Sequence, residues 1–205
     1  MAADTLAAPA ATDRISFEEF LSAYDGVHAE WIDGEVTLMT PNTDQHSRLL
    51  RFLSGILQPY AEEKQLGEVF VPAYAMWLGD RRAGREPDVF FVAREHGARV
   101  QRTFLDGPAD LVIEIISADS RGRDRGDKFY EYETAGVPEY WLIDPERRKV
   151  EAYRLGDDAT YEPVSLGEPA VLRPNALPGA WIPVEWLWQE PMPHVTAVLK
   201  EWGLI

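Results

Sequence analysis

The segment DLVIEIIS, residues 110–117, constrains the fold of this chain more than any other. A near-continuous run of β-branched and apolar residues is typical of a strand that is buried on both faces of a sheet. Glu114 lies in the middle of this run. An ionised carboxylate in a protein interior costs several kcal/mol unless a positive charge compensates it. The segment therefore predicts a buried strand with a positive partner beside Glu114.

The two faces of this strand follow from alternation along it. Val112 and Ile116 share the face of Glu114, whereas the other face carries Leu111, Ile113 and Ile115. The neighbouring patterns predict helices, hairpins and further strands in alternation. Helices are expected over residues 15–25, with Ser16 as N-cap, over 43–64, and over 121–136, with Gly136 as C-cap. Strands are expected in a hairpin over 28–40, and over 67–78, 86–92, 108–117, 139–144 and 149–155, with a polar arginine loop over 79–86.

This order predicts an α/β (α+β) fold with a central mixed β-sheet flanked by helices. The 205 residues, 45% of them hydrophobic, suit a single domain over residues 14–205 after a flexible Ala/Pro-rich tail over 1–13. No apolar run approaches the ~20 residues of a membrane span, and the first 13 residues do not resemble a secretory signal. We therefore expect a soluble, cytoplasmic protein.

Charge and cysteine content exclude several classes of function. The net charge of −15 argues against a general nucleic-acid coat or a membrane-surface protein, because both need a basic surface. It leaves room for a nuclease whose basic residues gather around one cleft. The absence of cysteine excludes disulfides, thiolate metal sites and cysteine nucleophiles.

Acidic residues at two strand ends predict a metal site. Asp88 opens the apolar stretch that precedes the Glu114 strand, and two carboxylates at adjacent strand ends can share one Mg²⁺ ion. Lys128, on the helix that follows Glu114, could reach back to help position or deprotonate an attacking water. His46, in the first turn of its helix, and Glu30, beside apolar neighbours, are further candidates for the same cleft.

Several of these motifs together resemble the Uma family of restriction-endonuclease-like proteins, in the PD-(D/E)xK nuclease superfamily. The resemblance covers about residues 15–155. Its most specific part is the block over residues 123–144, RDRGDKFYEYETAGVPEYWLID. The shorter matching motifs are PD at 87–88, EIIS at 114–117 and AEWIDG at 29–34, together with His46.

The resemblance implies a restriction-endonuclease-like core and a role for each residue. Asp88 would be the aspartate of the PD motif, Glu114 the acidic residue of the next strand, and the main-chain carbonyl of Ile115 a third ligand of Mg²⁺, for which Mn²⁺ can substitute. The superfamily's usual lysine, two places after the glutamate, is replaced here by Ile116, and Lys128 would take its role. Glu30 and His46 would complete the site.

The implied activity is metal-dependent hydrolysis of DNA phosphodiester bonds, with no covalent enzyme intermediate. We expect a homodimer, because two-fold dimers are the commonest assembly and would suit cutting both DNA strands. The family commonly has Ser-Pro-Ser after this strand, whereas residues 117–120 here read SADS, which bears on loop geometry. Six arginines could line a cleft for DNA phosphates, or could instead be solvated and pair with local acidic residues. These arginines are Arg81, Arg82, Arg85, Arg121, Arg123 and Arg125.

Other interpretations remain open at this point. Glu114 could be neutralised by a buried arginine in a structural ion pair, and Lys128 could be a solvated surface residue. The chain could then be a catalytically inactive binding or scaffold protein with the nuclease fold. A metal-dependent hydrolase of another phosphoester is a third possibility.

Overall fold

The computed structural model of the protein describes residues 14–39, 43–79, 83–117 and 126–205. The expected tail over residues 1–13 lies outside this part of the chain. The described elements are α1 (Phe17–Ala23), β1 (Ala29–Ile32), β2 (Glu35–Leu38), α2 (Asp44–Glu63), β3 (Gly67–Phe70), β4 (Ala75–Trp77), β5 (Ala83–Arg85), β6 (Val89–Ala93), the 3₁₀-helix η2 (Arg94–Arg99), β7 (Phe104–Asp106), β8 (Leu111–Ile115), α4 (Asp127–Ala135), β9 (Glu139–Asp144), β10 (Lys149–Leu155), β11 (Tyr161–Pro163), β12 (Val171–Leu172), β13 (Ile182–Pro183), the 3₁₀-helix η3 (Val184–Trp188) and α5 (Val195–Glu201).

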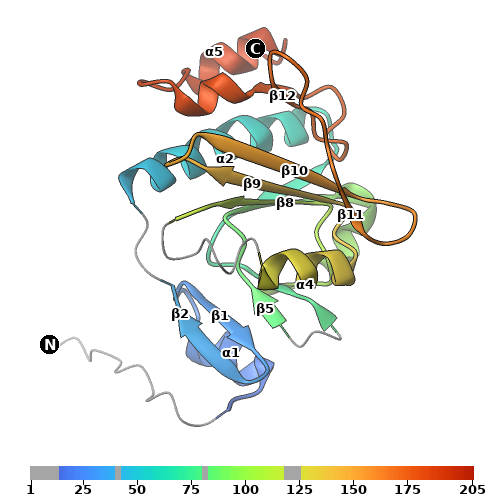
Figure 1. Cartoon of the computed structure of the whole chain (residues 1–205). Helices are drawn as coiled ribbons and strands as arrows, with labels where there is room; N and C mark the ends of the chain where they lie inside the picture. The colour runs from blue at the N-terminus through green and yellow to red at the C-terminus, as the bar shows by residue number, and fades with distance from the viewer. Residues whose placement is uncertain (1–13, 40–42, 80–82, 118–125) are drawn as a thin grey trace, which may run out of the picture.

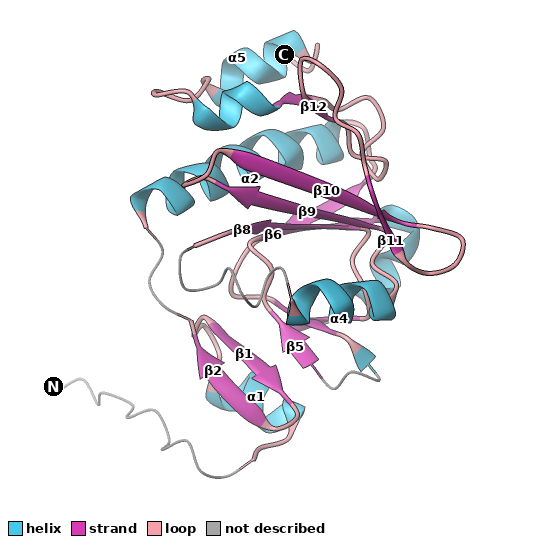
Figure 2. Cartoon of the chain, in the orientation of Figure 1, coloured by secondary structure: helices cyan, strands magenta, loops and turns pink. Residues whose placement is uncertain are grey.

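A mixed six-stranded sheet forms the centre of the molecule, with strand order β11-β10-β9-β8-β6-β3. Strands β8 and β9 run parallel, and the other neighbours in this sheet are antiparallel. Helix α2 covers one face of the sheet and α4 lies on the other (Figures 1 and 2). The predicted mixed sheet with flanking helices is therefore confirmed.

The two faces of β8 have the side chains that alternation predicts. Leu111, Ile113 and Ile115 pack into a core cluster with the apolar residues of α2. Val112 and Ile116 pack into a second cluster that includes Tyr132 of α4. Glu114, on this second face, is only 3% exposed. The strand therefore carries its carboxylate into the interior, as the sequence pattern indicated.

The helices begin and end at the residues that favour caps. Ser16 accepts from the backbone N–H of Glu19, whose side chain accepts in turn from the N–H of Ser16, which makes a capping box at α1. Thr43 caps α2 by accepting from the N–H of His46. Helix α4 ends at Gly136, whose φ of 81° places it in the left-handed region where glycine is favoured.

A second sheet, with order β2-β1-β5-β4-β7, packs against α1 below the central sheet (Figure 1). The β1–β2 hairpin turns at Asp33 and Gly34, both of which have positive φ, as expected for an Asp-Gly turn. The single strand expected over residues 67–78 was wrong, because it divides into β3 in the central sheet and β4 in this one.

The expected arginine loop over residues 79–86 was also wrong in part. Its last residues form β5, which is buried and pairs with both β1 and β4. Gly84 is required there, because a Cβ atom at this position would lie 2.5 Å from the Phe17 ring. Residues 80–82 lie outside the described ranges.

The carboxyl-terminal segment covers α2 on the side away from the sheet (Figure 1). The Tyr60 hydroxyl donates to the carbonyl of Pro178 at 2.8 Å, and the Trp202 ring packs edge-on against Tyr60. Trp186 and Trp188 are also packed against this core. No helix in the described ranges is long and apolar enough to cross a membrane.

Candidate functional site

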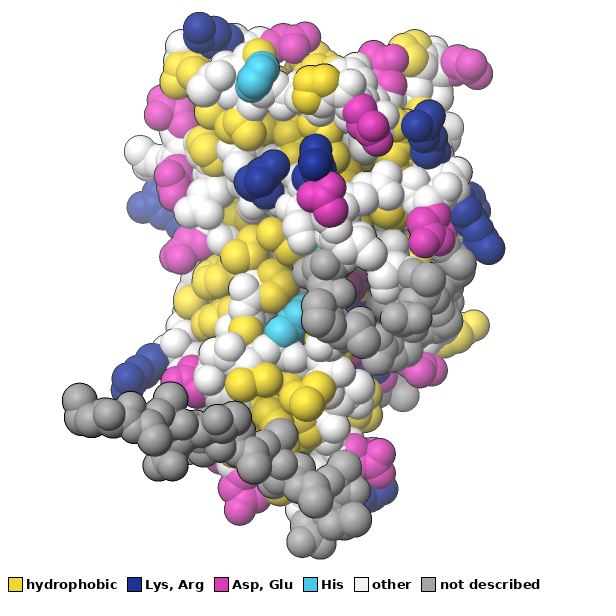
Figure 3. All heavy atoms as spheres, turned by 90° about the vertical axis from the view of Figure 1, so that its left-hand side faces the viewer, with side chains coloured by type: hydrophobic (Ala, Val, Ile, Leu, Met, Phe, Trp, Pro, Cys, Tyr) yellow, Lys and Arg dark blue, Asp and Glu magenta, His cyan; other side chains and the backbone are white. Residues whose placement is uncertain are grey.

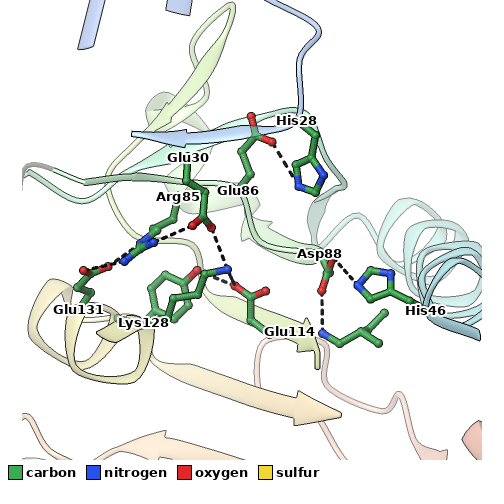
Figure 4. Close-up of polar contacts among 11 residues, drawn as sticks. His28, Glu30, His46, Arg85, Glu86, Asp88, Glu114, Lys128 and Glu131 are labelled. Atoms are coloured by element: carbon green, nitrogen blue, oxygen red, sulfur yellow. Dashed lines mark hydrogen bonds and ion pairs between the residues drawn. The ribbon is translucent and has the colours of Figure 1, made fainter. Parts of the chain in front are cut away.

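The site is built where two antiparallel strands meet at one end of the central sheet. Strand β6 pairs with β8 so that Val89 lies opposite Ile113, and one residue further Asp88 therefore comes opposite Glu114. Opposed residues of an antiparallel pair share a face. Asp88 Oδ2 accepts a 2.8 Å hydrogen bond from the backbone N–H of Ile115, which fixes the start of β6 to the end of β8 (Figure 4).

Lys128 joins this end of the sheet to the second sheet. It lies on the first turn of α4 and is only 2% exposed. Its Nζ lies 2.9 Å from Oε1 of Glu114 and 2.9 Å from Oε1 of Glu30 on β1. The Tyr132 hydroxyl, one turn further along α4, donates to the same Glu114 oxygen at 2.8 Å. Among the described residues, a lysine from the following helix is therefore a positive partner of Glu114.

Arg85 extends the chain of ion pairs beyond Glu30. Its Nη1 donates to Glu30 Oε2 at 2.7 Å, while Nε and Nη2 donate to the two oxygens of Glu131 at 2.7 and 2.9 Å. The fork-to-fork pairing with Glu131 is the geometry in which arginine binds a carboxylate most specifically. Glu30 is thus held between two cations, and it is fully buried.

Two histidines approach the site from the other side of Asp88 (Figure 4). His46, in the first turn of α2, places Nε2 3.0 Å from Asp88 Oδ1, and its buried Nδ1 has no hydrogen-bond partner among the described residues. His28 places Nε2 3.6 Å from Oε2 of Glu86, and this buried oxygen makes no hydrogen bond with the described part of the chain. Glu86 is 5% exposed. In both pairs, an imidazole nitrogen therefore lies beside a carboxyl group at the edge of the sheet.

The buried carboxyls have opposite titration behaviour because their neighbours differ. Burial acts to raise the pKa of Glu30, but Lys128 and Arg85 outweigh it and lower that pKa to about 2. At Glu86 burial dominates and raises the pKa to about 8, although the Ala29 backbone N–H opposes the shift. Burial, with the charge of Glu114, also raises the pKa of Tyr132 well above its ordinary value. At neutral pH Glu30 is therefore ionised and Glu86 holds its proton.

Charge balance and ligand chemistry at the site fit a hard divalent cation. Among the described residues the connected cluster holds four carboxylates against the two strong cations Lys128 and Arg85. These carboxylates are Glu30, Asp88, Glu114 and Glu131. The described ranges contain no group of three or more Asp, Glu or His side chains that could by itself hold a metal ion. Mg²⁺ does not require one, since it binds through one or two carboxylates and keeps several waters.

The structure brings together the five side chains proposed from the sequence. Asp88, Glu114, Lys128, Glu30 and His46 come from five different elements or connections and meet at one end of the central sheet (Figure 4). The main chain of Ile115 lies beside them at the end of β8.

The expected role of Arg85 in binding phosphates does not hold. Arg85 is 1% exposed, and the two carboxylates described above occupy its guanidinium. The other arginines expected to line a cleft, Arg81, Arg82, Arg121, Arg123 and Arg125, lie outside the described residues.

Sequence reasoning missed four members of this cluster: His28, Glu86, Glu131 and Tyr132. Tyr132 is fully buried, and nothing in the sequence indicated its hydrogen bond to Glu114. The spacing of Lys128, Glu131 and Tyr132 was a usable signal, because residues three and four apart share one face of a helix. Glu86 and His28 gave no comparable signal.

The fold and this end of the sheet define a nuclease-fold protein. A solved structure described as a putative nuclease belonging to DUF820, from Anabaena variabilis, superposes with a TM-score of 0.71 at 18% identity, and the match covers 85% of this chain and 97% of that one. Residues 17–185 match the Uma2 family, described as "Putative restriction endonuclease". The chain therefore belongs to the Uma2 family. A relative in Synechocystis sp. (strain ATCC 27184 / PCC 6803 / Kazusa), the uncharacterized protein sll1609, is 30% identical over 131 residues, which is 63% of this chain and 73% of that protein.

Proposed function

We propose that this protein is a Mg²⁺-dependent endonuclease that hydrolyses phosphodiester bonds in DNA. The observation that carries the proposal is the placement of Lys128, whose Nζ lies 2.9 Å from Glu114 while Asp88 is fixed to the next residue of the same strand. Membership in the Uma2 family supports the same class of activity. The alternative of a purely structural cluster is weakened by the excess of carboxylates over cations among the described residues of the cluster, which a divalent cation would offset.

Asp88, Glu114 and the main-chain carbonyl of Ile115 would hold the ion. When bound, Mg²⁺ would supply Lewis-acid chemistry by lowering the pKa of a water and by offsetting charge on a phosphate oxygen. Mn²⁺ has the same preference for oxygen ligands and should substitute. The hydrogen bond from the Ile115 N–H to Asp88 would keep both carboxylates on one face of the sheet before the ion arrives.

Lys128 would place its ammonium at the reacting phosphate and orient the attacking water. Glu30 and Arg85 would act through Lys128, because Glu30 fixes the ammonium and Arg85 fixes Glu30. Such preorganised charge near a phosphoryl group is a large source of catalysis. His46 would orient Asp88 through the 3.0 Å contact of its Nε2.

The test is cleavage of mixed nucleic acids with Mg²⁺ or Mn²⁺ by the parent and by Glu114→Gln. Glu139→Gln is a matched control, because Glu139 is also a buried glutamate of the central sheet, at the start of β9 and hydrogen-bonded to Trp141 and Asn175. We expect Glu114→Gln to lose at least about 100-fold in rate and the control to retain activity. Equal cleavage by the parent and Glu114→Gln would refute the site.

We further propose that two chains pair about a two-fold axis, so that two sites can act on the two strands of DNA. Two-fold dimers are the commonest assembly of soluble chains. Sedimentation equilibrium should give twice the mass of the chain, and a monomer at every concentration would contradict this part of the proposal.

A further inference from the structure

An exposed basic turn lies at the same end of the sheet as the candidate site. Strands β8 and β9 are parallel, so the turn that follows β9 emerges at the edge where Glu114 and Asp88 meet. Residues 146–149 of this turn are exposed. Strands β8 and β10 are separated by two strand spacings, or about 10 Å. At about 3.4 Å of rise per nucleotide along the DNA helix axis, this lateral offset corresponds to about three nucleotide steps.

This turn and the start of α2 line one groove. Its lining consists of Arg148 from the turn, Asp44, Gln45 and Arg48 from α2, and residues 187–192. Its volume is about 270 Å³. Figure 3 looks onto this end of the molecule and shows cationic side chains beside an acidic one in the middle of the face. The groove thus adjoins the turn of α2 that carries His46.

The two arginines of the groove have donors to offer a ligand. Arg48 donates through Nε to Asp44 Oδ2 at 2.8 Å, and its terminal nitrogens make no hydrogen bond with a described residue. Arg148 makes neither an ion pair nor a side-chain hydrogen bond within the described ranges. Asp44 therefore fixes the Arg48 guanidinium without occupying it. An arginine fork is well suited to a phosphate.

The charge of the groove suits a limited number of phosphates. The chain as a whole carries −15, so a polyanion should be repelled by most of its surface. Two exposed arginines beside the site offset this repulsion locally. Asp44 and Glu190 also line the groove and keep it close to neutral. This balance suits contact with one or two phosphates rather than tight, non-specific coating.

We infer that Arg48 and Arg148 form a phosphate-binding subsite that holds the DNA backbone beside the cleavage position. The inference rests on the proposed nuclease function and assigns the phosphate contacts to α2 and the β9–β10 turn. Contacts of this kind position a substrate strand and carry no sequence information.

The experiment measures binding of a fluorescein-labelled 20-bp DNA duplex by anisotropy, in EDTA so that no cleavage occurs, at several salt concentrations. The variants are Arg48→Gln and Arg148→Gln. The matched control is Arg102→Gln. Arg102 is exposed in the connection between η2 and β7, after the end of β6 that lies away from Asp88. Thermal melting of each variant verifies the fold.

We expect each groove variant to raise the Kd about threefold to tenfold. The slope of log K against log salt should become shallower by about 0.9 for each phosphate that the variant no longer neutralises. Arg102→Gln should bind like the parent. Parent-like Kd and slope in both groove variants would overturn the subsite while leaving the cleavage proposal intact. If the parent neither binds nor cleaves DNA, the proposed function and this subsite both fail.

Discussion

The protonated state of Glu86 should make the stability of the fold depend on pH. This carboxyl has its pKa raised from an ordinary 4.5 to about 8, chiefly by burial. The folded chain therefore holds the Glu86 proton more tightly than the unfolded chain does. The stabilising contribution is fully present below pH 4.5 and is lost as the pH rises to about 8. At about 1.4 kcal/mol per pH unit, about 3 kcal/mol is lost between pH 4.5 and pH 7.

Glu86→Gln should remove this dependence, because glutamine is neutral at every pH and similar in shape. Relative to the parent, the variant should gain about 3 kcal/mol in free energy of unfolding between pH 4.5 and pH 7. For a chain of this size the gain corresponds to a relative rise in Tm of about 6–12 °C. The assay is urea unfolding across this pH range in EDTA, so that no divalent cation adds charge beside Asp88.

An exposed carboxylate gives the control for this measurement. Glu95 is exposed in η2, and Glu95→Gln should track the parent at all pH values. If the stability difference between Glu86→Gln and the parent is the same at pH 4.5 and pH 7, burial does not hold the Glu86 proton and the reasoning fails.

Two other substitutions probe the cluster and its support. Lys128→Met should abolish cleavage and destabilise the fold by roughly 3–5 kcal/mol in urea unfolding, because it removes the ammonium that lies between two buried carboxylates. Retained activity would exclude Lys128 from the chemistry. Gly84→Ala should cost about 1–3 kcal/mol, because its Cβ would lie 2.5 Å from the Phe17 ring. The control Gly97→Ala has open space at this position, and a similar loss in both variants would contradict the packing argument.

Local patterns in the sequence predicted most of the central sheet. Alternation about Glu114 gave both core faces of β8, and the predicted caps at Ser16 and Gly136 gave one end each of two helices. These features depend on neighbours within a few residues, which is why a pattern can reveal them.

Features that depend on residues distant in the sequence could not be predicted from local patterns. Strand β5 contains a glycine and an arginine, and it is stable as a buried strand because carboxylates 55 and 46 residues away compensate Arg85. The exact pairing of Asp88 opposite Glu114 depends on the register of β6 with β8. Glu86 is acidic and follows an arginine, so its burial became visible only in three dimensions.

The central claim is that Asp88 and Glu114 together bind one divalent cation, and titration calorimetry with Mn²⁺ tests it most directly. The parent should bind one ion per chain, and Asp88→Asn should bind none measurably. Asp110→Asn is the matched control, since Asp110 is equally buried and also accepts from a backbone N–H, at the other end of β8. Uptake of Mn²⁺ by Asp88→Asn with the affinity of the parent, or no uptake by the parent itself, would contradict the account.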